Sequence, residues 1–192
     1  MITPNSARTA ILQAYSVDLH GASAFEPVIS GGRSSSNDKI SNRFVAGVVI
    51  AAVESQISLR HWLLWAYGPA FFANLASCQT GAVMLVADLC DIDWENLTAP
   101  VKTRTESLIY LHMDNYRALA VNGSHKYRKP AHFAAALEQL TSGTLKLCMS
   151  NYQRDFGYLS EVVHDACERL DKIGLGPVAK VLPHIGELQG VA

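Results

Sequence analysis

The residues with the clearest chemical potential stand in one run, Tyr152–Gln153–Arg154, which closely follows Ser150. A serine with a glutamine three residues later is typical of a capping box, in which the two side chains satisfy amides at the start of a helix. In a helix-turn-helix, residues at the start of the second helix reach the edges of DNA bases. Glutamine suits a bidentate contact with adenine, and arginine one with guanine. This run therefore predicts base recognition by Tyr152, Gln153 and Arg154, with two ordinary packed helices as the alternative.

Basic residues gather around this run. Residues 101–154 hold eight lysines and arginines against three acidic residues, a net charge of +5, although the whole chain of 192 residues carries −1. Residues 44–100 and 155–192 are acidic, with net charges of −4 and −3. A basic middle between acidic flanks is what a confined site for a polyanion needs. Four side chains are the candidates for phosphate contacts: Lys126, Arg128, Lys129 and Lys146.

Two helices would have to position the base-reading run. A short helix is predicted over Thr144–Met149, and a long one over Ser150–Lys172. Gly174 and Gly176–Pro177 are expected to end the long helix, because glycine and proline are poor in a helix interior. A final short turn follows over Val178–Ile185. The chain is thus predicted to end in a helix-turn-helix-like pair.

The rest of the chain shows the helical spacing of apolar residues, and no alternating pattern long enough for a strand. Further helices are predicted over Ser6–Leu19, Ser41–Gln56, Ser58–Gly68, Gln79–Leu89, Thr98–Ala120 and Ala131–Leu140. Residues 21–38 are rich in serine and glycine, which is typical of a linker. We therefore expect an all-α fold in which residues 1–40 form a flexible N-terminal arm and linker, and residues 41–192 form one compact multi-helix domain.

An aromatic segment, Leu59–Phe72, is expected to organise that domain. Trp62 and Trp65 are three residues apart, so a helix places them on neighbouring parts of one face. Gly68 suits a left-handed cap at the end of this helix, and Pro69 suits the first turn of the next. Because aromatic side chains bury the largest area, we expect this hairpin to form the main core.

Composition and motifs argue against several classes of function. The four cysteines form no C-x-x-C pair and have apolar neighbours, so we expect buried free thiols and no metal site. Cys167 lies three residues after His164, but no orienting group or oxyanion loop accompanies them. No phosphate-binding loop, dinucleotide fingerprint or metalloprotease motif occurs. We expect a protein that is not an enzyme and needs no cofactor.

The chain also lacks the signals of membrane insertion and export. No apolar stretch reaches the ~18 residues of a transmembrane helix without a charged or strongly polar residue. No basic segment followed by an apolar run opens the N-terminus. A cytoplasmic protein without a membrane partner is expected.

Two stretches resemble a known family. Trp62–Leu63–Leu64–Trp65–Ala66–Tyr67–Gly68, after an apolar helix, is similar to a W-x-x-x-x-Y-G segment of the phage late-gene antitermination proteins called Q, of the lambdoid phage 82 type. The tract from Tyr152–Gln153–Arg154–Asp155–Phe156 to Cys167–Glu168–Arg169–Leu170–Asp171 resembles their C-terminal helix. The zinc-binding cysteines of the lambda branch are absent, so the resemblance is to the branch without a zinc finger.

The resemblance implies a phage transcription regulator in the cytoplasm of a bacterial host cell. Such proteins bind double-stranded DNA at a late-promoter element, engage the bacterial RNA polymerase paused nearby, and suppress pausing and termination. The alternative is a protein-binding module without catalytic activity, such as a phage-borne inhibitor, which uses the aromatic hairpin as its interface. It predicts that Trp62, Trp65 or Phe71 is exposed.

Overall fold

The computed structural model describes residues 7–20 and 36–190, and the fold over this part of the chain is all-α, as predicted. The elements of the first half are α1 (Ala7–His20), α2 (Ser36–Glu54), α3 (Arg60–Tyr67), α4 (Ala70–Ala73) and α5 (Ala76–Leu89). Those of the second half are the 3₁₀ turn η2 (Trp94–Asn96), α6 (Ala99–Asn122), α7 (Pro130–Leu140), α8 (Met149–Phe156) and α9 (Leu159–Gly190). No strand occurs among these described residues.

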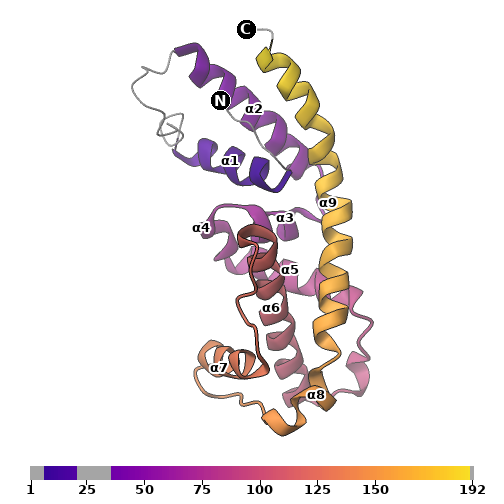
Figure 1. The fold of residues 1–192 in the computed structure, drawn as a ribbon. Coiled ribbons are helices and arrows are strands. Elements are labelled where there is room, and N and C mark those ends of the chain that lie inside the picture. Colours follow the sequence, from indigo (N-terminus) through magenta and orange to yellow (C-terminus); the bar gives the residue numbers. More distant parts are fainter. Residues whose placement is uncertain (1–6, 21–35, 191–192) are drawn as a thin grey trace. The chain divides into compact units, whose positions relative to one another are not determined.

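The helices divide into two compact units (Figure 1). Unit 1 contains the described residues of Met1–Gln79 and Asp171–Ala192, and unit 2 contains Thr80–Leu170. The boundaries fall inside α5 and α9, whereas the sequence predicted one boundary near residue 40. A contiguous division was expected because composition shifts along the chain, but here both ends of the chain contribute to unit 1.

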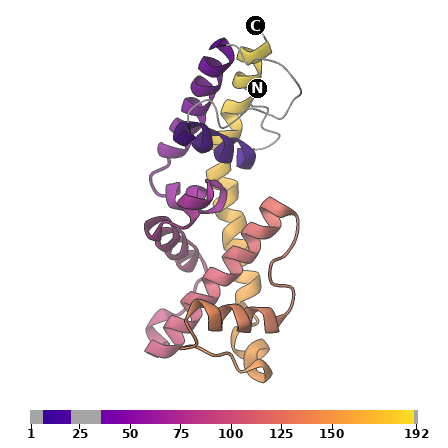
Figure 2. The same ribbon diagram turned by 90° about the vertical axis from the view of Figure 1, so that its left-hand side faces the viewer.

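The first helix is part of the core of unit 1. Ala10, Ile11, Ala14 and Val17 of α1 are buried, and α1 contacts α2 and α3. Figure 2 shows α1 and α2 side by side from a second direction. The prediction of an arm over residues 1–40 is therefore wrong for α1, because its apolar face has a partner. Residues 21–35 of the predicted linker lie outside the described residues.

The aromatic helix α3 forms the centre of unit 1, which confirms its prediction as core. Trp62 and Trp65 are 0% and 1% exposed, and their rings lie 5.7 Å apart. Gly68 follows with φ −70°, so no left-handed cap is present. Glycine is required for space instead, because a Cβ at this position would lie 2.5 Å from the carbonyl oxygen of Leu64.

Unit 2 is built around α6, whose middle turns carry buried apolar residues. Leu108, Ile109, Leu111 and Met113 are at most 2% exposed. The helix ends at Gly123, whose φ of 68° gives the left-handed cap that glycine adopts without strain. Helix α7 contacts α6 and α8. The predicted site residues lie in α8 and in the two segments that join these three helices.

The C-terminal helix pair differs from its prediction. Residues 144–148 are not helical, the short helix is α8, and the long helix begins only at Leu159. Ser142 and Gly143 have φ of 50° and 80°, which turns the chain away from helical geometry. Local bonds then compete with the helix, because the Thr141 hydroxyl oxygen accepts a hydrogen bond from the Leu145 amide at 3.1 Å. The short helix, turn and long helix are therefore present, but displaced toward the C-terminus.

The N-cap of the short helix and the end of the long helix also differ from their predictions. Cys148 is the N-cap residue of α8, so Ser150 lies inside the helix and the predicted capping box does not form. Helix α9 continues through Gly174 and through Pro177 and Pro183. A Cβ at position 174 would lie 3.0 Å from the Leu63 side chain. The Gly174 carbonyl also accepts a hydrogen bond from the Gln56 side chain. Close packing within unit 1 thus overrides the weak helix propensity of this stretch.

Candidate nucleic-acid interface

The predicted phosphate contacts lie mostly in the segment between α6 and α7, residues 123–129, here named the basic loop. Its backbone is held to α6 by Asn115, whose side-chain oxygen accepts from the Tyr127 amide at 2.8 Å. Asp114 accepts from the Tyr127 hydroxyl at 2.8 Å and from Lys126 Nζ at 2.7 Å. The amide of Arg128 donates to His132 Nδ1 at 3.2 Å, which ties the loop to the first turn of α7. Because these bonds hold the backbone, the loop has little backbone freedom left to lose on binding.

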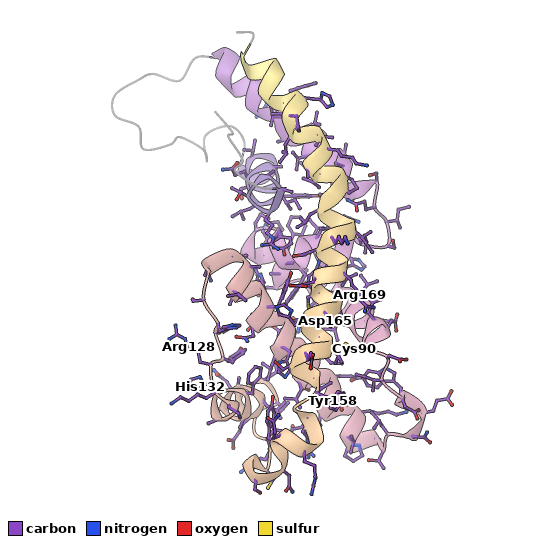
Figure 3. All side chains as sticks on the ribbon, turned by 45° about the vertical axis from the view of Figure 1, so that its right-hand side comes forward. Cys90, Arg128, His132, Tyr158, Asp165 and Arg169 are labelled. Carbon is purple, nitrogen blue, oxygen red and sulfur yellow. The ribbon has the colours of Figure 1, made fainter. Side chains whose placement is uncertain are left out.

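Asp114 divides the cations of the loop into two kinds. The hydrogen bond to Asp114 raises the pKa of Lys126, so this ammonium stays charged but is paired. Burial, followed by the bond to Asp114, raises the pKa of Tyr127 to about 12, so Tyr127 stays a neutral donor. Arg128 and Lys129 are exposed and form no ion pair with any residue in the described ranges. These two side chains are the loop's available positive charges, and Figure 3 labels Arg128 beside His132.

A buried aromatic cluster connects the basic loop to α8. The ring centroid of Phe133 lies 5.1 Å from that of Tyr127, 4.4 Å from that of His112 and 6.4 Å from that of Tyr152. Tyr152 in turn lies 6.4 Å from Phe156. The loop and the predicted base-reading run are therefore attached to the same core in unit 2.

Tyr152 is a member of that core, and its predicted role at a base edge is wrong. The residue is 5% exposed, and its hydroxyl lies 3.3 Å from His112 Nε2. Burial raises the pKa of Tyr152 and lowers the pKa of His112 to about 4, so the pair is a neutral one. A buried tyrosine of this kind satisfies a core histidine and cannot reach a ligand in solution.

Gln153 and Arg154, which follow Tyr152, have the solvent exposure that base recognition requires. Gln153 and Arg154 are exposed, but they stand in the last turns of the short helix α8. The long helix α9 opens instead with buried Leu159 and with exposed Ser160 and Glu161. Its first turn therefore offers no base-reading cation, and recognition by the start of a long second helix is not supported by this geometry.

Lys146 lies in the extended segment before α8. It is exposed, and its ammonium lies 3.5 Å from a carboxylate oxygen of Glu138 on α7. Since both side chains are largely exposed, this ion pair is weak and yields readily to a phosphate. Lys146 therefore stays available for a phosphate contact.

Sequence reasoning missed a polar network at the centre of unit 1. Asp171 is 5% exposed and accepts hydrogen bonds from Trp62 Nε1 at 3.0 Å, the Tyr67 hydroxyl at 2.5 Å and Arg8 Nη2 at 2.9 Å. The Arg8 guanidinium also lies over the Tyr67 ring. A signal was present in the sequence, because a buried tryptophan and tyrosine both need an acceptor for their polar hydrogens.

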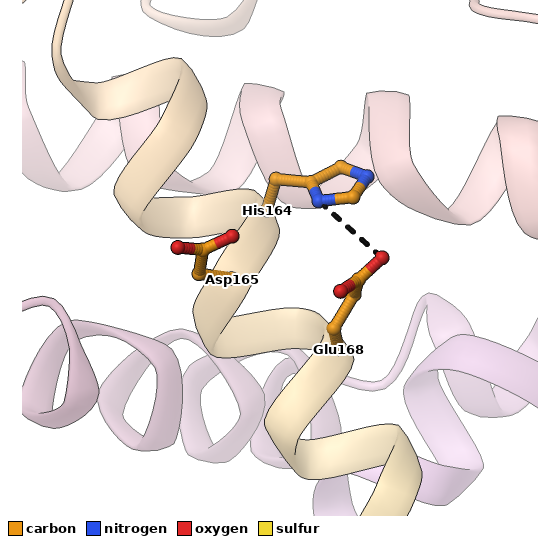
Figure 4. Close-up of side chains that lie close together, drawn as sticks. All are labelled: His164, Asp165 and Glu168. Atoms are coloured by element: carbon orange, nitrogen blue, oxygen red, sulfur yellow. Dashed lines mark ion pairs between the residues drawn. The ribbon is translucent and has the colours of Figure 1, made fainter.

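The cysteines are all free, and three of the four are buried as expected. Cys148 is the exception and is exposed at the start of α8. Burial raises the pKa of Cys90 to about 11, which keeps it a thiol. Cys167 is fully buried, so it cannot act as a nucleophile with His164. One group in the described part of the chain has the composition of a metal site, namely His164, Asp165 and Glu168 on α9 (Figure 4).

No family model, curated protein or solved structure matches this chain. The resemblance to the antitermination proteins is therefore carried by its own residues alone. Among the described helices, none has the length and apolar character needed to cross a membrane.

Proposed function

We propose that this protein is a phage-type transcription antitermination regulator that binds late-promoter DNA through unit 2. The observation that carries the DNA-binding part is the basic loop, a hydrogen-bonded segment that holds Arg128 and Lys129 exposed beside α7. Exposed cations on a held backbone suit contact with the phosphates of a duplex. The antitermination role comes from the resemblance at Trp62–Gly68 and at Tyr152–Asp171.

The contacts divide into two kinds under this proposal. Arg128, Lys129 and Lys146 bind phosphates and fix the orientation of the protein, while Gln153 and Arg154 read base edges. Lys126 is paired with Asp114 and therefore contributes little to phosphate binding. Tyr152 supports the surface from within the aromatic cluster.

The proposed partners beyond DNA follow from the family. RNA polymerase is the second partner, and the bacterial cytoplasm is the compartment in which both are found. A net charge of −1 gives the chain no general attraction for DNA, so retention on the promoter would depend on polymerase. No catalytic step is required.

A footprint on the protein's own late-promoter DNA, with and without polymerase, tests the role as a whole. We expect protection of a short element that strengthens when polymerase is present. Absence of protection in both conditions would refute the DNA-binding role.

The salt dependence of binding tests the basic loop. Replacement of both Arg128 and Lys129 by alanine should flatten the slope of log affinity against log salt by about 2 units, because each phosphate contact contributes about 0.9. Lys172 and Lys180 are exposed lysines on α9, and their double alanine variant is the matched control for net charge. An equal change of slope in both variants would show only a general charge effect.

The fold reduces the number of hairpin residues that could form the interface of a protein-binding module. Trp62 and Trp65 are buried, so they are not an interface, but Phe71 of the same hairpin is 41% exposed. A Phe71→Ala variant that keeps its melting temperature and loses a protein partner, while DNA binding is absent throughout, would favour this alternative.

A further inference from the structure

We infer that His164, Asp165 and Glu168 form a binding site for a divalent transition-metal ion of the zinc class on the surface of α9. The three side chains belong to little more than one turn of the helix, and their ligand atoms all lie within 4.8 Å of one another (Figure 4). This site is separate from the proposed DNA contacts and does not depend on them.

The distances suit chelation. His164 Nδ1 lies 3.7 Å from Glu168 Oε1. Nitrogen and oxygen ligands lie ~2.0–2.2 Å from zinc, so two ligands of a tetrahedral ion are about 3.3 Å apart. Residues i and i+4 of a helix share a face, which is the spacing used by helical zinc sites. His164 and Glu168 therefore need to close by only a few tenths of an ångström. Asp165 completes a group whose ligand atoms lie within 4.8 Å, so it must move by up to about 1.5 Å. Both carboxylates can rotate, because both residues are exposed.

The imidazole is already oriented. Its ring meets the Tyr116 ring edge-on, with centroids 5.2 Å apart and an interplanar angle of 80°. Val163, Ala166 and Cys167 are buried around it, so this turn of α9 is fixed by its packed face. A ligand held in place before binding loses less freedom when the ion arrives.

The charges also suit a cation. A histidine binds a metal ion in its neutral form, so His164 and two carboxylates would give the ion a ligand set of net charge −2. Asp165 has no hydrogen bond or ion pair within the described part of the chain. A mixed imidazole and carboxylate set favours zinc, cobalt or nickel, whereas magnesium and calcium prefer oxygen ligands alone. Three protein ligands leave a coordination position open to water or to a ligand from a partner.

The experiment is calorimetric titration of the full, chelator-treated chain with zinc chloride, together with thermal melts in zinc or magnesium chloride. We expect zinc, but not magnesium at the same concentration, to bind and to raise the melting temperature. His164→Ala and Glu168→Gln should each weaken zinc binding by at least about tenfold. His61→Ala, which removes another exposed histidine, is the control and should leave the affinity unchanged.

Titration with cobalt separates this site from the thiols. Ligation by His164 and the carboxylates gives no thiolate-to-cobalt charge-transfer band. Such a band would assign the ion to cysteine and overturn the inference. Zinc binding that is absent, or that survives in His164→Ala, would also overturn the inference. Either result would leave His164 and Glu168 as neighbours on the helix that bind no metal ion.

Discussion

Asp171 provides a sharp test of the packing in unit 1, because one carboxylate accepts hydrogen bonds from α1 and α3. Its partners are Trp62, Tyr67 and Arg8, and the first two bonds are fully buried. In Asp171→Asn the amide oxygen can keep the indole N–H, but the NH₂ group then faces the Tyr67 hydroxyl and the guanidinium. The hydroxyl loses its acceptor, and the arginine meets a donor.

The cost follows from these lost bonds. An unsatisfied buried polar group costs ~1–3 kcal/mol, and breaking a buried charge pair costs up to about 5 kcal/mol. Arg8 is 37% exposed, so its share is reduced by solvent. We therefore expect Asp171→Asn to lower the free energy of unfolding by about 2–4 kcal/mol. Arg8→Ala leaves both buried bonds in place but removes the cation beside the carboxylate, so it should cost less, about 1–2 kcal/mol.

Urea unfolding followed by tryptophan fluorescence measures the difference. A Trp94→Phe background leaves only Trp62 and Trp65 of α3 as reporters, so the signal comes from unit 1. An Asp171→Asn variant within about 0.5 kcal/mol of its parent would show that the carboxylate contributes no net stability, and the reasoning would be refuted.

Three further outcomes are expected. Trp65→Ala removes a side chain that is 1% exposed, so it should cost ~3–5 kcal/mol; a fall in melting temperature below a few degrees would contradict its assignment to the core. Burial lowers the pKa of His112 from 6.5 to about 4, so between these values the unfolded chain binds a proton that the folded chain does not. Stability should fall by about 3 kcal/mol on acidification through that window, and His112→Gln should lack this dependence in pH-dependent melts. Arg154→Ala should weaken DNA binding by about 1–3 kcal/mol and relax preference at one base pair; equal binding to several operator variants would remove Arg154 from the reading set.

The helices with strong apolar periodicity could be predicted closely from the sequence. Thr98–Ala120 and Ala131–Leu140 differ from α6 and α7 by no more than two residues at either end. Their apolar spacing, the proline near each start and Gly123 after α6 all indicate the same boundaries. The burial of Trp62 and Trp65 was predictable for the same reason, since a wide apolar face must be covered.

The C-terminal boundaries could not be predicted, because an irregular turn and a tertiary contact decide them. Ser150 and Gln153 have capping-box spacing, yet α8 begins one residue before Ser150. The irregular turn at Ser142–Gly143 sets the direction in which the chain enters this helix. Gly174 has weak helix propensity, but in the fold its missing side chain allows Leu63 to approach. Leu63 is far from Gly174 in sequence, so no local pattern reports this contact.

The sequence predicted the exposed residues of the candidate site but not the burial of Tyr152. Each unit has an aromatic core whose polar groups are satisfied by a residue distant in sequence: Asp171 serves Trp62 and Tyr67, and His112 serves Tyr152. From sequence alone, a tyrosine beside glutamine and arginine is equally suited to a ligand or to a buried acceptor. Tyr152 is buried and therefore cannot contact a ligand, whereas the neighbouring Gln153 and Arg154 are exposed. A functional surface on unit 2 must therefore be built from residues that surround the aromatic cluster, and not from the aromatic residues themselves.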